Sequence, residues 1–324
     1  MTQAPSQKTV LISGCDSNYF PLLLEWLHSV RRFDQSKDFD ICILDAGLTS
    51  EQIERLKPHV QSIVNPEWPV KLPAYKIKGE YLKACVCRPF LPKIFPGYGT
   101  YIWMDADTWI QDWRAIELFL YGAAKGKITL TAQVDRAYPK GGARVKWLGR
   151  WPWKVRGFYF SNALRAFDFK TARDLLSYHV LLAGMFALRT DAPHWGRWQD
   201  FVKIAMTKGK VFTAEQLCLG KMCYQEGFDY EILPGYVHWL CEFKPLWDAD
   251  KQLFVEPFTP HEPLGVLHIS GFDKMRLDRT VTTDFETTDG KTIEYTYRYP
   301  YFDGEKDEDV IAKAAKHFSV VNSN

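Results

Sequence analysis

Two aspartates follow an apolar run in the first third of the chain. Residues 101–110 read YIWMDADTWI, so Asp105 and Asp107 lie two positions apart between hydrophobic residues. Carboxylate pairs of this kind occur in turns, in calcium-binding loops and in catalytic sites for hard divalent cations, which prefer oxygen ligands. A calcium loop is excluded because its sixth and twelfth positions, counted from Asp105, are Ile110 and Ile116 rather than Gly and Glu. The spacing by itself leaves a solvated turn and a metal site open.

The segments around this pair predict the elements that would position it. Strands are expected at 9–14, 39–47, 61–65, 101–104 and 127–135, and helices at 21–30, 50–56 and, interrupted by prolines, 80–94. Short strands that are apolar on both faces and alternate with helices indicate a mostly parallel sheet covered by helices. Ligands bind beyond the carboxyl ends of such strands. Asp16, Asp45, Asp105 and Asp107 all fall at strand ends, which predicts a site there.

The second half of the chain shows a less regular pattern. We expect irregular structure over 138–170, a strand near 185–190, helices at 194–206 and 213–225, and a last core strand at 265–270. Asp289-Gly290 favours a hairpin turn within 278–304, and 305–318 has the pattern of an amphipathic helix. The simplest division is one domain over 1–277, with 138–170 as an insertion, followed by a C-terminal extension over 278–324.

Composition narrows the class of protein. Hydrophobic residues make up 46% of the 324 positions, which is typical of a globular chain, and a net charge of +2 gives no global attraction for polyanions. Aromatic residues reach 15%, as in sugar-binding clefts, nucleic-acid platforms and membrane-edge surfaces. The seven cysteines show no disulfide or zinc pattern. The polar N-terminus and the lack of a run of about 20 apolar residues predict a cytoplasmic protein without a spanning helix.

Several segments resemble, in order, the retaining glycosyltransferases of family 8, which include glycogenin and bacterial lipopolysaccharide galactosyl- and glucosyltransferases. YIWMDADTWI is similar to the family's Y-L-D-x-D-T motif, and HISGFDK (268–274) matches H-x-x-G-x-x-K. Weaker similarities are found at VLISGCDSNYFP (10–21), TAQVD (131–135), LAGMFAL (182–188) and AEQLCL (214–219). The resemblance implies a single nucleotide-binding α/β domain of the GT-A type.

The resemblance also implies a role for each matching residue. It assigns Mn²⁺ or Mg²⁺ to Asp105, Asp107 and His268, and the pyrophosphate of a UDP-sugar donor to Gly271 and Lys274. The nucleoside and donor sugar would be bound by the remaining matches: Gly14, Asp16, Tyr19, Arg88, Asp135 and Gln216. Gln216 corresponds to the family position nearest the reacting face of the anomeric carbon. The resemblance also implies catalytic roles for Asp135 and Arg88. Chemically, the cation would neutralise the charge that develops on the departing diphosphate.

The sequence departs from the family pattern at sugar-side positions. Leu182 replaces an Asn, Glu215 and Leu217 replace the two acids of D-Q-D, and the last motif ends in Lys-Met-Arg rather than Lys-Pro-Trp. We therefore expect transfer of a hexose, glucose or galactose, from a UDP-sugar to a glycan or glycolipid with retention, while the exact sugar stays open. The alternatives are an inverting transferase with Glu215 as base, a metal-dependent nucleotidyltransferase, and a non-catalytic carbohydrate- or membrane-binding protein.

The stretch 140–160 (KGGARVKWLGRWPWKVRGFYF) is rich in basic and aromatic residues and contains no acid. Rings stack on sugars, and Lys and Arg bind phosphates. The stretch is therefore predicted to be an acceptor loop that meets a lipid-linked or lipopolysaccharide-type acceptor, or the anionic headgroups at the inner face of the membrane. Nucleic acid is a less favoured ligand for the same residues.

Overall fold

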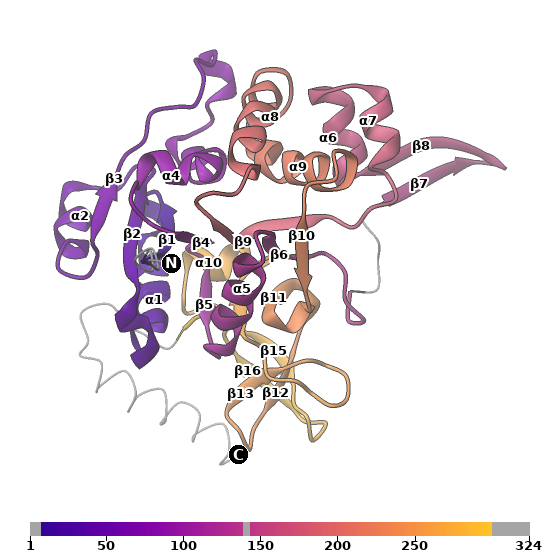
Figure 1. Cartoon of the computed structure of the whole chain (residues 1–324). Coiled ribbons are helices and arrows are strands. Elements are labelled where there is room, and N and C mark those ends of the chain that lie inside the picture. Colours follow the sequence, from indigo (N-terminus) through magenta and orange to yellow (C-terminus); the bar gives the residue numbers. More distant parts are fainter. Residues whose placement is uncertain (1–7, 139–142, 300–324) are drawn as a thin grey trace. The chain divides into compact units, whose positions relative to one another are not determined.

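The computed structural model describes residues 8–138 and 143–299, which form two compact units. We call residues 8–17, 38–104, 118–138 and 143–233 the sheet unit, and residues 18–37, 105–117 and 234–299 the C-terminal unit (Figure 1). The helix expected at 305–318 lies outside the described residues. The expected division after residue 277 stays a prediction.

The sheet unit is built on one seven-stranded sheet. In spatial order its strands are β10 (Tyr230–Leu233), β6 (Ile128–Ala132), β9 (Leu181–Arg189), β4 (Thr100–Met104), β1 (Thr9–Cys15), β2 (Asp40–Asp45) and β3 (Ser62–Val64). β9 runs antiparallel to both of its neighbours, and every other adjacent pair is parallel. The prediction of a mixed α/β fold with a mostly parallel central sheet is confirmed.

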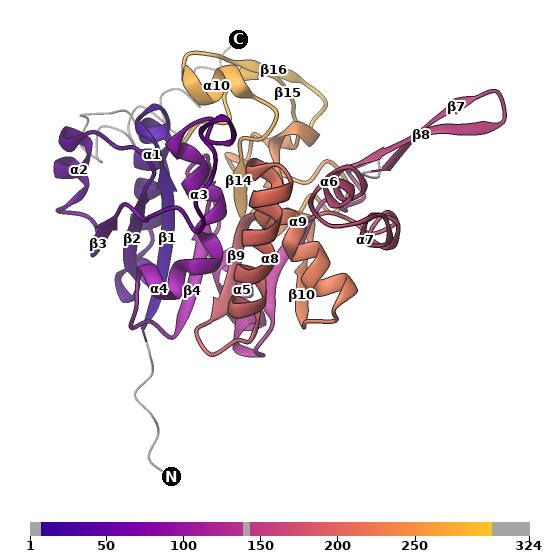
Figure 2. The same cartoon turned by 90° about the horizontal axis from the view of Figure 1, so that it is seen from above.

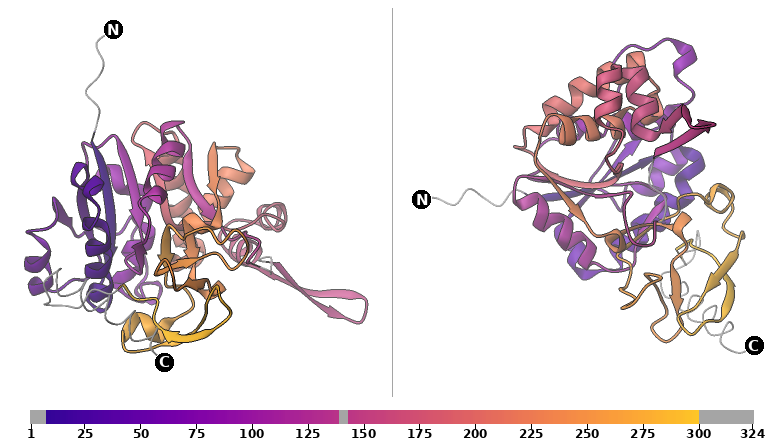
Figure 3. Two further views of the ribbon diagram at one scale, coloured as in Figure 1. Left: turned by 90° about the horizontal axis from the view of Figure 1, so that it is seen from below. Right: turned by 90° about the vertical axis from the view of Figure 1, so that its right-hand side faces the viewer.

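Helices cover this sheet because its strands are apolar on both faces. The helices of the unit are α2 (Ser50–Leu56), α3 (Lys83–Val86), α4 (Leu91–Ile94), α6 (Phe158–Ala166), α7 (Phe169–Asp174), α8 (His194–Lys208) and α9 (Ala214–Gly220), and α5 (Arg114–Ala124) ends in it. Trp195 and Trp198 of α8 pack on Phe186 of β9, and α8 and α9 lie on one side of the strands (Figure 3, right). None of the described helices is long and apolar enough to cross a membrane.

Local sequence signals explain how the first helices begin. Thr49 caps α2: its side chain accepts a hydrogen bond from the Gln52 amide, and the Gln52 side chain accepts one from the Thr49 amide. Pro21 lies in the first turn of α1 (Phe20–Arg31), a helix of the C-terminal unit, where its missing N–H costs nothing. Helices were predicted at 21–30 and 50–56, and both are present.

The C-terminal unit contains a three-stranded sheet and two hairpins. The sheet has the order β11 (His238–Leu240), β14 (Val266–His268), β5 (Thr108–Ile110). The hairpins are β12 (Leu246–Asp248) with β13 (Leu253–Val255) and β15 (Thr283–Glu286) with β16 (Thr292–Tyr295), and a short helix α10 (Asp273–Leu277) follows β14. The hairpin predicted around Asp289-Gly290 is confirmed. The expected core strand at 265–270 is β14, which pairs in this small sheet rather than in the main one, because an apolar pattern does not specify the pairing partner.

Aromatic rings and one buried ion pair hold the C-terminal unit together. Phe254 contacts the rings of Trp109, Tyr295 and Tyr297. Beneath α1, the guanidinium of Arg298 donates two hydrogen bonds to the Glu25 carboxylate, at 2.7 and 2.6 Å, and both side chains are buried. Such a bidentate pair fixes geometry as well as charge.

The expectation of irregular structure over 138–170 is wrong. Residues 143–157 form an antiparallel hairpin of β7 (Ala143–Leu148) and β8 (Trp151–Gly157), and α6 and α7 follow it. The two-residue turn between the strands has Gly149 at φ 59°, the positive value that glycine supplies at the first position of a type II′ turn. The glycine that suggested irregular structure is therefore the residue that allows the hairpin.

Candidate functional site

Strand pairing brings the two aspartates and the histidine together within the C-terminal unit. β5 follows Asp107 directly and pairs antiparallel with β14, with Thr108 opposite His268. The Ile269 amide donates to the backbone carbonyl of Asp107 at 2.9 Å, which continues the ladder beyond the strand end. The Thr108 amide and hydroxyl both donate to the carbonyl of Asp105 and close the turn between the acids. Residues far apart in the sequence thus converge at one sheet end.

The three side chains have the composition and spacing of a metal site. One ligand atom from each of Asp105, Asp107 and His268 lies within 4.8 Å of the others, and His268 Nε2 is 3.4 Å from Asp107 Oδ1. Two neighbouring ligands that each lie about 2.1 Å from one ion are roughly 3 Å apart, so this distance suits a shared cation. Two carboxylates and an imidazole fit Mn²⁺ or Mg²⁺ better than a thiophilic metal. The residues present therefore fit the predicted cation.

A second histidine orients the first. Nε2 of His238, on β11, lies 3.1 Å from Nδ1 of His268, and the two rings stack with centroids 5.2 Å apart. His238 is fully buried, and burial, with a smaller contribution from His268, holds its pKa well below the ordinary value, so it is neutral. A hydrogen bond at Nδ1 leaves Nε2 of His268 directed at Asp107, as in histidine ligands with an outer hydrogen-bond partner.

Arg276 of α10 occupies the other side of Asp107. Its Nη1 donates to Asp107 Oδ2 at 2.8 Å, and its Nη2 pairs with Asp273. The buried Nε atom of Arg276 has no hydrogen-bond partner among the described residues. The guanidinium also lies 5.8 Å from the centroid of the Tyr19 ring. Asp107 is thus shared between a cationic side chain and the candidate metal position.

These charges control the protonation of the cluster. Burial by itself would raise the pKa of the Asp107 carboxyl, but His268 and Arg276 outweigh burial and hold it well below its usual range. Burial would lower the pKa of His268, and Asp107 reverses this and raises it. Asp107 is therefore ionised at neutral pH and available to a cation.

The predicted pyrophosphate residues lie next to this cluster in the chain. Gly271 has φ 77°, and a Cβ atom there would lie 2.7 Å from the Cβ of Glu242, so both backbone conformation and packing require glycine. Lys274 is exposed on α10. The structure therefore gives Gly271 a steric reason of its own, and phosphate binding by Gly271 and Lys274 stays a prediction.

Arg88 is buried in the sheet unit, where it binds protein groups. Its Nε donates to the Ala84 carbonyl at 2.9 Å, its Nη1 donates to the Ala183 carbonyl at 2.8 Å, and its guanidinium lies 4.9 Å from the ring centroid of Trp103. Nη1 also lies 3.2 Å from Oε1 of Glu215, which is buried too. Glu215 is the residue that replaces the family's first acid, and the structure makes it the counter-ion of Arg88.

The other predicted donor residues of this unit lie at element ends. Gly14 is in β1, where an added Cβ would be 2.5 Å from the Leu44 carbonyl oxygen, so close strand packing explains it. Asp16 follows β1 and is half-buried. Asp135 follows β6, and its side chain accepts a hydrogen bond from the Ala137 amide, which is a turn geometry. Gln216 is half-exposed on α9. Their roles toward a donor stay predictions.

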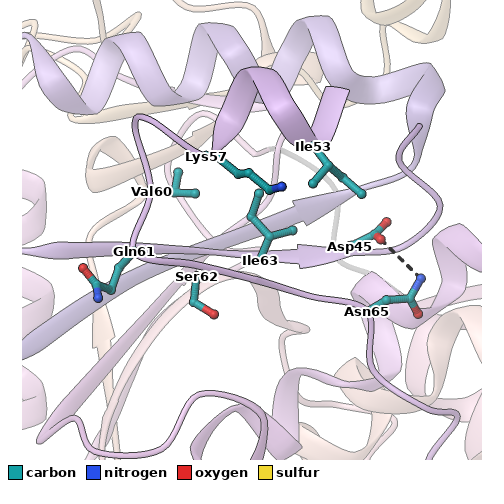
Figure 4. Close-up of a pocket in the computed structure, with 8 residues that line it drawn as sticks. All are labelled: Asp45, Ile53, Lys57, Val60, Gln61, Ser62, Ile63 and Asn65. Atoms are coloured by element: carbon teal, nitrogen blue, oxygen red, sulfur yellow. Dashed lines mark hydrogen bonds between the residues drawn. The ribbon is translucent and has the colours of Figure 1, made fainter. Parts of the chain in front are cut away.

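A hollow of about 430 Å³ lies at the β3 edge of the sheet unit (Figure 4). Its wall combines apolar side chains such as Ile53 and Ile63 with Lys57, Asp45 and Asn65. Asp45 is one of the four strand-end carboxylates noted in the sequence, and no residue assigned to the metal or the donor lies in this wall. Asp45 Oδ1 accepts hydrogen bonds from two backbone amides of the following turn, and Oδ2 accepts one from the side-chain amide of Asn65 at 3.3 Å. The carboxylate at this strand end therefore closes a turn.

Sequence reasoning missed His238 and the part played by Arg276. His238 lies in a short strand with no motif, and only the pairing of β11 with β14 brings it to His268. In the sequence, Arg276 was noted only because it stands where the family's Lys-Pro-Trp ending has Trp. The available signal was the i, i+3 spacing of Asp273 and Arg276, which predicts that the two side chains lie on the same face of a helix.

Comparisons with known proteins bear on the fold. No family model matches the chain, and no curated protein matches it. An active-site mutant of LgtC matches with a TM-score of 0.50 and 13% identity over 81% of this chain and 87% of its own. The bifunctional glycosyltransferase WbbM matches with a TM-score of 0.50 and 15% identity over 84% of this chain and 47% of its own, so this chain spans about half of WbbM. A complex of the galactosyltransferase LgtC with donor and acceptor sugar analogues gives a TM-score of 0.49 at 13% identity, over 81% of this chain and 87% of its own. The likeness to LgtC and WbbM confirms a GT-A-type α/β fold, and membership of family 8 stays a prediction.

Proposed function

We propose that this protein is a metal-dependent glycosyltransferase that transfers a hexose, glucose or galactose, from a UDP-sugar to a glycan or glycolipid. The observation that carries the proposal is the convergence of Asp105, Asp107 and His268 at one sheet end, in a chain whose fold resembles that of GT-A glycosyltransferases. A bound Mn²⁺ or Mg²⁺ would supply Lewis-acid neutralisation of the donor diphosphate.

The residues around the cluster have separate tasks in this proposal. His238 holds His268 at Nδ1, so Nε2, which lies 3.4 Å from Asp107 Oδ1, would be the atom that binds the cation. Arg276 and Lys274 provide positive charge for the diphosphate oxygens, since a guanidinium can bind phosphate through two N–H groups. Gly271 permits the tight turn between β14 and α10. Tyr19, beside Arg276, is assigned to the nucleoside.

The remaining predicted residues keep the roles toward the donor that the family resemblance implies. Asp16 and Gly14 are assigned to the nucleoside, and Asp135 to sugar hydroxyls. Gln216 is assigned to the reacting face, where a neutral amide orients rather than attacks. Arg88 is a positioning residue, because its guanidinium binds protein groups and holds Glu215, the neighbour of Gln216.

Retention of configuration is the stereochemical part of the proposal. An inverting enzyme needs a carboxylate base on the acceptor side, and Glu215 was the nominated candidate. Its side chain is buried and paired with Arg88, which does not suit a base that must reach an acceptor hydroxyl. The anomeric configuration of the product, read by NMR, distinguishes the two outcomes. An inverted product would contradict the proposal of retention and leave metal binding untouched.

Donor hydrolysis in the presence of Mn²⁺ tests the proposal. UDP release from UDP-glucose and UDP-galactose is measured for the wild type and for Asp105→Asn and Asp107→Asn, with Asp289→Asn as a matched control in the same unit. We expect each cluster variant to lose about 100-fold or more of the rate, since the ligand set would lose one charged donor. Asp289→Asn should match the wild type, because Asp289 lies in the exposed turn of the β15–β16 hairpin.

A binding measurement separates loss of chemistry from loss of fold. Thermal unfolding with and without Mn²⁺ and UDP should show a rise in midpoint for the wild type that is absent in Asp107→Asn. Equal hydrolysis rates and equal thermal shifts in wild type and Asp107→Asn would refute the metal assignment. The acceptor, of glycan, glycolipid or lipopolysaccharide type, is then sought by adding candidate acceptors to the same UDP-release assay.

A further inference from the structure

The β7–β8 hairpin of the sheet unit is an uncovered two-stranded ribbon. Its strands pair with each other, and β8 continues directly into α6, from which the ribbon projects (Figure 2). All six residues of β7 are exposed, and so are most of β8. A lone hairpin of this kind is only marginally stable in water, because it has no second layer to pack on.

One face of the hairpin carries two directly opposed pairs of cations. In the strand register Arg144 faces Arg156, and Lys146 faces Lys154. Directly opposed residues of an antiparallel pair point to the same face, so the four charges form one strip. Like charges in this arrangement destabilise a ribbon, and in the described part of the chain no carboxylate pairs with any of the four. An external anion would remove the repulsion.

The other face of the hairpin is apolar, and large apolar residues flank the turn, which itself contains Gly149 and the cation Arg150. Val145 faces Val155 on the side away from the cations. Toward the turn Leu148 is opposite Trp151, which is 79% exposed, and Trp153 is 71% exposed. Large exposed apolar side chains that gather at one end of a projecting element mark a surface for interaction.

The turn also fixes the shape of this tip. Gly149 supplies the positive φ that joins the strands, and the register shifts by one residue at Trp147, where Pro152 lies opposite. A proline in the second strand removes one donor and restricts the backbone, which favours a defined bulge over an open loop. The rings are therefore presented on a structured ribbon.

We propose that this hairpin is a membrane-contact element: Leu148, Trp151 and Trp153 enter the interface of a lipid bilayer while the cationic strip binds anionic headgroups. Tryptophan prefers the boundary between headgroups and acyl chains, and each Lys or Arg near an anionic surface adds attraction. A soluble polyanion would neutralise the four cations of the strip but would leave the apolar residues at the tip exposed to water. A bilayer accommodates both the cationic strip and the apolar residues beside the turn. This inference does not depend on the donor chemistry proposed above.

Co-sedimentation of the full chain with vesicles tests the inference. Vesicles of equal parts phosphatidylglycerol and phosphatidylcholine are compared with pure phosphatidylcholine. We expect sedimentation with the anionic vesicles and weak sedimentation with the neutral ones. The variant Leu148→Ser/Trp151→Ser removes the apolar tip, and Lys146→Gln/Lys154→Gln removes half of the strip. Each should weaken binding to anionic vesicles about tenfold or more.

A matched control distinguishes the hairpin from general positive charge. Lys208→Gln/Lys210→Gln removes the same charge from the exposed C-terminal end of α8 and should bind vesicles as the wild type does. Unchanged thermal unfolding in all variants shows that the fold is retained. Equal vesicle binding by hairpin and control variants would overturn the inference. So would binding of a single-stranded DNA oligonucleotide without binding to anionic vesicles. UDP release from a soluble donor is measured in parallel, so failure of the transferase proposal is seen separately.

Discussion

Replacing Arg276 by methionine should strengthen metal binding. Arg276 is paired with Asp107 at 2.8 Å, so a divalent ion bound to the same carboxylate would lie close to a guanidinium. A +2 and a +1 charge about 5 Å apart repel by roughly 1.7 kcal/mol at the dielectric constant of water and by about four times as much at an effective value of 20. The Asp107 carboxylate lies between the two positive charges and offsets part of their repulsion, so we take a value near the lower figure. Relief of about 1.5 to 3 kcal/mol corresponds to an affinity for Mn²⁺ raised roughly 10- to 100-fold.

Electron paramagnetic resonance of free Mn²⁺, without nucleotide, measures this affinity directly. Methionine keeps much of the length of the side chain, and Lys291→Met is the control, since it removes one exposed charge of the same unit that pairs with Asp289. Lys291→Met should change the Mn²⁺ affinity by less than about twofold. If Arg276→Met bound Mn²⁺ no more tightly than the wild type, Arg276 would not compete for the candidate site, and the assignment of Asp107 as a ligand would lose its electrostatic basis.

Two further predictions concern stability and thiol chemistry. Arg298→Leu should lower the free energy of unfolding by about 3 kcal/mol in urea denaturation, because the buried Glu25 carboxylate loses its bidentate partner and keeps only Arg279, 3.2 Å away. Adding Glu25→Leu should recover part of the loss, and no recovery would contradict this account. Burial raises the pKa of the Cys42 thiol to about 11 and that of Cys87 to about 12, so these thiolates are scarce at pH 8. The half-buried Cys85 should therefore react first with a disulfide reagent, and Cys85→Ser should remove the fast phase; a fast phase that persists would mean that a buried thiol is open to reagent.

The local part of the fold follows from the sequence because its causes act over a few residues. Runs such as 9–14 and 101–104 are short, apolar and bounded by polar residues, which predicts buried strands, and their alternation with helices favours parallel pairing. The exception is β9, which is antiparallel to both of its neighbours. Thr49 and Gln52 define the start of α2 by capping, and Asp289-Gly290 defines the turn of the β15–β16 hairpin. Such signals need no knowledge of distant residues.

The hairpin over 143–157 was not predicted from the sequence, because the unusual composition of this segment hid its turn. The glycines and basic residues of 138–170 suggested irregular structure, yet Gly149 closes a two-residue turn and the strands pair in register around it. Glycine both breaks regular elements and enables the tightest hairpins. The outcome depends on whether the flanking residues can pair, and here the flanking residues are basic on one face, a pattern that predicts surface exposure rather than a strand.

The sequence by itself determined that two carboxylates end a buried strand and that a histidine ends another. Only the tertiary structure decided that they meet, because the antiparallel register of β5 and β14 places Thr108 opposite His268. It also placed Arg276 on Asp107 and buried Arg88 against Glu215. The hydrophobic pattern of a segment predicts which of its residues are buried. Which strand or charged side chain each one pairs with depends on the whole chain, because every buried charge and every strand edge needs a partner.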